Sequence, residues 1–180
     1  MKAFAKIVFI LIFFVTLTIA EGCAPTFISI SIPEIQTVEN SYYSAQFKPL
    51  AEDKNYFDRF RLSVTNKTRK DLEIDWNKTR YLYNGHDIGI FVFEAIKPEN
   101  IKNLTIPPDT IPAGQSFTKD ISPLKLLARE PLTGQGVSAG KITFGPIPTG
   151  ENGIFLFIRQ NSNTIKEKMA VKITEKQVRQ

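Results

Sequence analysis

Alternation of apolar and polar residues runs through most of the chain and predicts half-buried β-strands. Phe60, Leu62 and Val64 alternate with polar neighbours, and Leu72, Ile74 and Trp76 do the same a few residues later. The polar segment 66–70 between these two runs is short enough for a hairpin. The pattern therefore predicts two strands joined by a tight turn, with Trp76 packed in the core.

Further strands are predicted along the rest of the chain. Residues 81–83 lead into Asn84-Gly85, a dipeptide that favours a tight hairpin turn, and residues 88–95 resume extended sequence. Alternating or continuous apolar runs predict the remaining strands at 117–121, 142–144, 154–158 and 169–173. The segment 145–153, dense in Gly and Pro, is typical of a connection between strands.

Helical patterns are sparse. Residues 98–104 have proline at the first helical position, and residues 122–129 begin with a serine cap followed by proline. Both segments are predicted as short helical crossings between strands. The fold class expected is all-β: an immunoglobulin-like antiparallel β-sandwich over residues 41–180, with one or two short helical crossings.

The N-terminus has the pattern of a secretory signal peptide over residues 1–22. Lys2 and Lys6 precede the unbroken apolar run 7–15, which is shorter than the ~20 apolar residues of a membrane-spanning helix. Two cleavage sites compete. Cleavage after Ala20 would leave a free thiol at Cys23, whereas cleavage before Cys23 would make that cysteine the first residue of a lipoprotein. Cys23 is the only cysteine, so it forms no disulfide within the chain, and lipidation is the favoured interpretation.

Residues 23–40 are interpreted as a lipid-anchored tether. The run 27–33 alternates like a strand, while 34–40 is more polar. Its first part is expected to pair with a sheet edge, and the alternative is a disordered stalk that spaces the domain from the membrane.

Charge and composition argue against a nucleic-acid-binding protein, a triad hydrolase and a zinc protein. The formal net charge of +5 comes from basic residues that interleave with acidic ones, which does not favour a nucleic-acid partner. His86 is the only histidine, and its neighbour Asp87 would point to the opposite face of a strand, so no catalytic triad is indicated. One histidine and one lipid-bound cysteine do not supply a zinc site, and no cofactor is expected.

Two other segments contain residue types that some binding or catalytic sites use. Asp71, Glu73 and Asp75 lie at alternate positions and would form a row of carboxylates, for which the favoured interpretation is the solvent face of an amphipathic strand rather than a calcium or glycosidase site. The segment 134–140 contains three glycines without the dinucleotide-binding spacing, and it is expected to be a surface loop.

The segment 60–123 resembles a group of small bacterial lipoproteins of no assigned activity. The resemblance is carried by Leu62–Thr68, Ile74–Thr79, Asn84-Gly85, Ile111–Gln115 and Ile121–Pro123. It implies an exported, lipid-anchored β-sandwich and supplies no catalytic residues.

The function expected is therefore non-enzymatic. The leading hypothesis is a membrane-anchored module of the bacterial envelope, facing the periplasm or the cell surface, that binds another envelope protein or contributes to envelope assembly. The alternative is a carbohydrate- or peptidoglycan-binding module that uses exposed aromatic residues such as Tyr81, Tyr83 and Phe91. Burial of these aromatics would favour the first hypothesis.

Overall fold

A computed structural model describes residues 25–51, 55–94, 96, 98–129 and 142–178. Cys23, the signal segment 1–22 and the glycine-containing segment 134–140 lie outside the described residues. Among the described residues, no helix has the length and apolar content needed to cross a bilayer.

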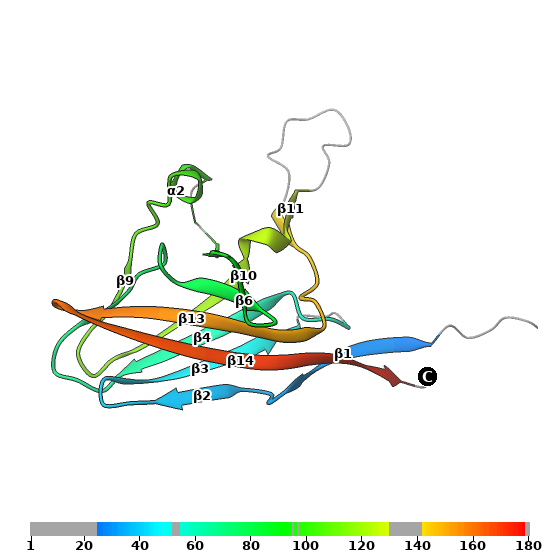
Figure 1. The fold of residues 1–180 in the computed structure, drawn as a ribbon, viewed down its shortest axis with the longest axis horizontal. Helices are drawn as coiled ribbons and strands as arrows, with labels where there is room; N and C mark the ends of the chain where they lie inside the picture. The colour runs from blue at the N-terminus through cyan, green and yellow to red at the C-terminus, as the bar shows by residue number, and fades with distance from the viewer. Residues whose placement is uncertain (1–24, 52–54, 95, 97, 130–141, 179–180) are drawn as a thin grey trace, which may run out of the picture. The chain divides into compact units, whose positions relative to one another are not determined.

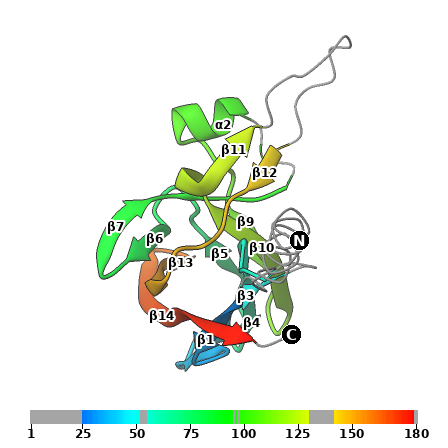
Figure 2. The same ribbon diagram turned by 90° about the vertical axis from the view of Figure 1, so that its right-hand side faces the viewer.

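The described chain is an antiparallel β-sandwich of two main sheets, which confirms the predicted all-β class (Figure 1). The larger sheet has the order β1-β14-β13-β5-β9, with β6 pairing β13 and β7 pairing β6, and the five-stranded sheet has the order β2-β3-β4-β10-β8. A separate ribbon pairs β11 with β12 (Figure 2). The elements are β1 (Thr26–Ile32), β2 (Gln36–Glu39), β3 (Tyr43–Leu50), β4 (Arg59–Asn66), β5 (Leu72–Ile74), β6 (Arg80–Tyr83), β7 (His86–Gly89), β8 (Phe91–Val92), α2 (Pro98–Asn103), β9 (Asp109–Ile111), β10 (Ser116–Pro123), η1 (Leu124–Leu126), β11 (Leu127–Arg129), β12 (Ile142–Phe144), β13 (Gly150–Gln160) and β14 (Asn163–Val178).

The core lies between the inner faces of the two sheets. Residues of β3 and β4 that alternate with polar neighbours are fully buried, as the two-residue period requires. The ring of Phe60 on β4 stacks on Phe47 at a centroid distance of 4.4 Å and lies 6.4 Å from Tyr81 of the opposite sheet. Aromatic contacts of this kind therefore join the two layers.

The long β13–β14 hairpin is the main structural unit of the larger sheet. Its register runs without a break from Gly150↔Ile173 to Gln160↔Asn163. The predicted alternation at 169–173 is confirmed, because Met169, Val171 and Ile173 are buried. β5 and β6 pair with the other side of β13, so a single strand organises much of this sheet.

The predicted turn at Asn84-Gly85 is confirmed as the link between β6 and β7. Asn84 has φ 48° and Gly85 has φ 80°, the two positive values that a type I′ hairpin turn requires. Tyr83 pairs with His86 directly beside this turn. The predicted helical turn near Pro98 is also present as α2.

The hairpin predicted between Val64 and Leu72 is wrong. β4 pairs with β3 and β10 in the five-stranded sheet, whereas β5 pairs with β13 and β9 in the larger sheet. The buried side chain of Asn66 accounts for the crossing, because its Nδ2 donates to the backbone oxygens of Lys70, Ile111 and Pro112 at 2.8–3.1 Å. These bonds hold the connection across the end of the sandwich instead of folding it back beside β4.

The short helix predicted over residues 122–129 is present only as the 3₁₀ helix η1, and it does not begin at Ser122. β10 continues through Ser122 and Pro123, which pair with Val92 and Phe91, and only the short 3₁₀ turn η1 follows before β11. Ser122 does not act as a helix cap, because its hydroxyl donates to the backbone oxygen of Asp58 at 3.1 Å. The hydrogen bonds of the sheet therefore override the local capping pattern.

The first part of residues 23–40 pairs with a sheet edge, as predicted, and residues 26–39 contribute one strand to each sheet. β1 lies at the end of the larger sheet beside β14, and β2 pairs with β3 at the edge of the five-stranded sheet. The alternating pattern of residues 27–32 suits an edge strand, and a backbone hydrogen bond from Ser29 to Asn55 fastens its outer side. The strands of the sandwich therefore begin much earlier than residue 41.

Trp76 is fully buried, as predicted, although it lies in the turn after β5 rather than in the strand itself. Its ring centroid is 5.1 Å from that of Phe93. Its Nε1 donates to Oδ2 of Asp109 at 2.7 Å, and Asp109 also pairs with Lys119. The Lys119 ammonium lies 3.9 Å from the Phe93 ring centroid and 5.5 Å from that of Trp76. This cluster joins β9 of one sheet to β10 of the other.

Candidate functional site

A surface hollow with a volume of about 400 Å³ lies beside β4 and β10 of the five-stranded sheet. Its walls combine charged, hydroxyl and aromatic side chains from β4, β10, β12 and the residues after β8. The lining residues are Arg59, Arg61, Phe93, Glu94, Thr118, Lys119, Asp120, Ile121, Ser122 and Phe144.

The pairing of β4 with β10 positions the central polar groups of this hollow. The antiparallel register places Arg61 opposite Asp120 and Ser63 opposite Thr118. Alternation directs their buried neighbours, such as Phe60 and Leu62, to the core, so these polar residues share the outer face of the sheet. A row of hydrogen-bonding side chains across two strands is the result.

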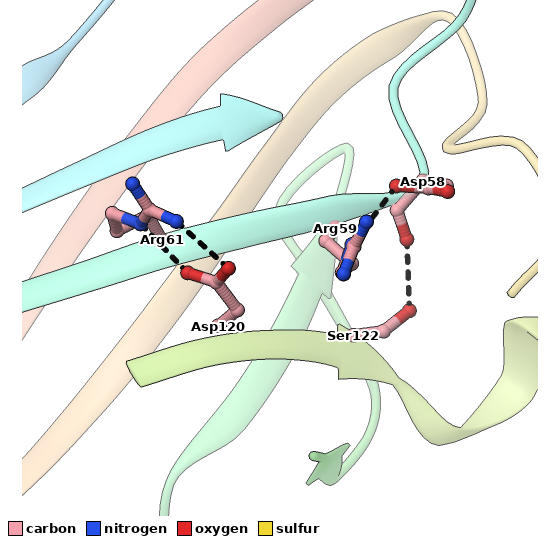
Figure 3. Close-up of polar contacts among 5 residues, drawn as sticks. All are labelled: Asp58, Arg59, Arg61, Asp120 and Ser122. Atoms are coloured by element: carbon pink, nitrogen blue, oxygen red, sulfur yellow. Dashed lines mark hydrogen bonds and ion pairs between the residues drawn. The ribbon is translucent and has the colours of Figure 1, made fainter. Parts of the chain in front are cut away.

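Arg61 and Asp120 form a two-pronged ion pair on this face (Figure 3). The Arg61 Nε donates to Oδ1 of Asp120 at 2.7 Å, and its Nη2 donates to Oδ2 at 2.9 Å. The hydrogen bond to Asp120 raises the pKa of Arg61 above its ordinary value. The guanidinium therefore stays protonated, so it can bind a ligand but cannot transfer a proton.

The hydroxyl pairs extend this arrangement along the sheet. The hydroxyl oxygens of Ser63 and Thr118 lie 3.1 Å apart, and those of Thr65 and Ser116 lie 2.8 Å apart. Short hydroxyl side chains give up little rotational freedom when a partner binds. This part of the face therefore suits contact with a polar partner.

Asp58 anchors the other end of the hollow (Figure 3). It is 2% exposed, its backbone oxygen accepts the bond from Ser122, and its Oδ1 accepts a bond from the Arg59 Nε at 3.3 Å. The connection from β3 to β4 is held to β10 by these contacts. The buried carboxylate of Asp58, the residue directly before β4, thus fixes the position of Arg59.

His86 and Asp87, for which the sequence indicates no catalytic triad, lie beside the Asn84-Gly85 turn. His86 is exposed on β7, and its neighbour Asp87 lies 3.4 Å from the Arg80 Nε and accepts a bond from the backbone nitrogen of Gly89. Within the described part of the chain, no cluster of three or more His, Cys, Asp or Glu residues could hold a metal ion.

The carboxylate row is only partly exposed to solvent. Asp71 is exposed and accepts a bond from the backbone nitrogen of Ala113, and Glu73 pairs with Arg159 at 3.3 Å across the strands. Asp75 differs from the prediction because it is 7% exposed and lies in the turn that buries Trp76. Its backbone oxygen accepts bonds from the nitrogens of Lys78 and Thr79, so this residue shapes the turn.

The aromatic residues considered for carbohydrate binding lie mainly inside the sandwich. Tyr81 is 2% exposed and Phe91 is fully buried. Tyr81 donates a hydrogen bond to the buried Asn152, and the Tyr83 hydroxyl donates to the backbone oxygen of Thr149 at 2.9 Å. Tyr81 and Phe91 therefore offer no exposed surface for stacking on a sugar ring.

The pair of Arg61 and Asp120 was not predicted from the sequence. The two residues are separated by 59 positions, and each is an ordinary charged residue on the polar face of its strand. Opposite charges on the outer faces of two strands were the available signal. Their meeting depends on which strands pair, and local alternation does not contain that information.

No protein-family model, curated protein or solved structure matches this chain. A function for the protein therefore rests on the chemistry of its own residues.

Proposed function

We propose that the protein is an exported bacterial lipoprotein whose β-sandwich, of immunoglobulin-like type, is a non-enzymatic binding or envelope-assembly module. Residues 1–22 are the signal peptide, and the mature chain begins at a lipid-modified Cys23. Acyl chains contribute about 0.8 kcal/mol for each buried methylene, and two chains suffice for stable anchoring to a membrane. The domain then faces the periplasm or the cell surface.

One observation supports a binding role above the others: the hollow on the outer face of β4 and β10 is lined by polar groups fixed by one another. Arg61 and Asp120 neutralise each other while both remain partly exposed, at 48% and 32% of their side chains. Such a pair offers hydrogen-bond donors and acceptors to a partner, and a partner that bonds to both groups offsets the cost of removing their charges from water. It favours a polar protein surface as the partner.

A sugar or peptidoglycan ligand is less well supported. That alternative relied on aromatic residues at the surface, and Tyr81 and Phe91 are part of the core. A catalytic role is also less well supported, because Asp71, Glu73 and Asp75 each make a contact that holds the fold: with the backbone of Ala113, with Arg159, and with the backbone of Lys78 and Thr79.

Site-specific crosslinking in the native host tests the binding role. A photo-crosslinking amino acid at Thr118, an exposed residue of the hollow, is compared with one at Lys172, an exposed residue of β14 in the other sheet. We expect Thr118 to give a discrete crosslinked envelope protein that is absent at Lys172. Identical patterns at both positions would count against a partner at the hollow.

A pair of double variants tests the same face without changing net charge. Arg61→Ala with Asp120→Ala removes the ion pair beside the hollow, and Lys168→Ala with Glu151→Ala removes a 3.4 Å pair of similar exposure on the other sheet. We expect only the first double variant to lose the Thr118 crosslink and to reproduce the phenotype of gene deletion. Equal effects from both would refute a role specific to the hollow.

A further inference from the structure

Two exposed aromatic residues, Phe27 and Tyr56, lie on neighbouring segments at the start of the sandwich. Phe27 is 48% exposed on β1, and Tyr56 is 36% exposed in the connection between β3 and β4. The backbone nitrogen of Ser29 donates to the backbone oxygen of Asn55 at 2.7 Å, which fastens this connection to β1. The two segments that carry these exposed aromatic residues therefore lie side by side.

The sequence around Phe27 is unusual for a protein surface because it lacks charge. No charged residue occurs between Glu21 and Glu34, a stretch that includes Cys23 and all of β1. Exposed strands at a sheet edge usually carry charged residues that discourage association. A stretch without charged residues is expected where the surface lies against a lipid bilayer or another molecule.

Few residues separate Cys23 from Phe27, which limits how far this surface can lie from a lipid attached to Cys23. Phe27 is four residues after Cys23, and a fully extended chain spans at most about 3.6 Å per residue, or roughly 14 Å in all. With residues 26–32 already in β1, no long stalk remains between the cysteine and the folded domain. A lipid on Cys23 would hold Phe27 close to the headgroup layer.

We propose that Phe27 and Tyr56 contact the lipid bilayer in which Cys23 is anchored, so that the domain lies directly on the membrane. This inference rests on the proposed lipidation of Cys23. Aromatic side chains are favoured at the boundary between headgroups and hydrocarbon, where an apolar ring and a polar group find suitable surroundings together. Between Glu21 and Glu34 the sequence has no acidic residue, so this stretch is not repelled by anionic lipids.

A fluorescent label at single positions tests this contact in the full acylated protein. Lipidation occupies the thiol of Cys23, the only cysteine, so Phe27→Cys, Tyr56→Cys and Leu104→Cys each provide one reactive thiol. Leu104 is the matched control, because it is also apolar and is 49% exposed at a site remote in sequence, after α2. Each protein carries an environment-sensitive dye and is inserted into vesicles of phosphatidylethanolamine and phosphatidylglycerol.

We expect the dyes at positions 27 and 56 to be quenched by nitroxide-labelled lipids and protected several-fold from an aqueous quencher, relative to position 104. Equal accessibility at all three positions would overturn the inference. Protection that rises with the protein-to-lipid ratio would assign this surface to a second copy of the chain and would also overturn it. The mass of each preparation is measured first, so a failure of lipidation is distinguished from a failure of membrane contact.

Discussion

Replacing Trp76 by alanine is predicted to destabilise the protein strongly. Trp76 is the only tryptophan, it is fully buried, and it packs against Phe93. Its indole nitrogen also donates to Asp109, which pairs with Lys119 on the opposite sheet. The substitution therefore removes a large apolar ring and one of the partners of a partly buried carboxylate at the same time.

The expected magnitude follows from these contacts. Truncation of a buried tryptophan to alanine costs about 3–5 kcal/mol of unfolding free energy. For a domain of this size, 1 kcal/mol lowers the midpoint of thermal unfolding by about 2–4 °C, so Trp76→Ala is expected to lower it by roughly 6–20 °C. Trp76→Phe retains an aromatic ring and mainly removes the hydrogen bond, and its expected cost is smaller, about 1–3 kcal/mol.

Thermal and urea unfolding followed by far-UV circular dichroism measures these changes without relying on tryptophan fluorescence. Leu104→Ala is the control, since Leu104 is 49% exposed and its truncation is expected to change stability by less than about 0.5 kcal/mol. The order of stability should be parent, Trp76→Phe, Trp76→Ala. A midpoint for Trp76→Ala within about 2 °C of the parent would refute the assigned packing.

Two further predictions concern buried positions of β3 and β13. Burial raises the pKa of Tyr43 to about 12 from its ordinary value of 10.0, so the unfolded chain ionises first and stability is lost as the pH rises from 10 towards 12. Tyr43→Phe should lessen this alkaline loss in urea midpoints measured across that range, and parallel curves would contradict the stated cause. A Cβ at Gly153 would lie 2.6 Å from the backbone oxygen of Met169, so Gly153→Ala should cost about 1–3 kcal/mol in urea unfolding. Adding Ala170→Gly should not restore stability because the nearest obstacle is backbone, and recovery of the parent midpoint would show that the side chain of Ala170 is the true obstacle.

The strands with the clearest alternation were predictable from the sequence. Phe60, Leu62 and Val64 face the core as their two-residue period requires, and the Asn84-Gly85 turn has the expected backbone angles. These features depend on neighbours within a few residues. A local pattern therefore contains all the information that they need.

The pairing of the strands was less predictable. Asn66 looks like an ordinary turn residue, yet its buried amide bonds to Ile111 and Pro112, far along the chain, and sends β5 into the other sheet. Asp75 looks like an exposed strand residue, but the turn that buries Trp76 also covers it. Such contacts depend on the complete topology, and the same is true of Arg61 and Asp120.

The intact mass of the mature protein, purified from the membranes of its native host, tests the central proposal most directly. We predict a chain that begins at Cys23 and carries the added mass of a diacylglycerol group, with any further acyl chain on its amino terminus. An unmodified chain that begins at Glu21, after cleavage behind Ala20, would contradict it.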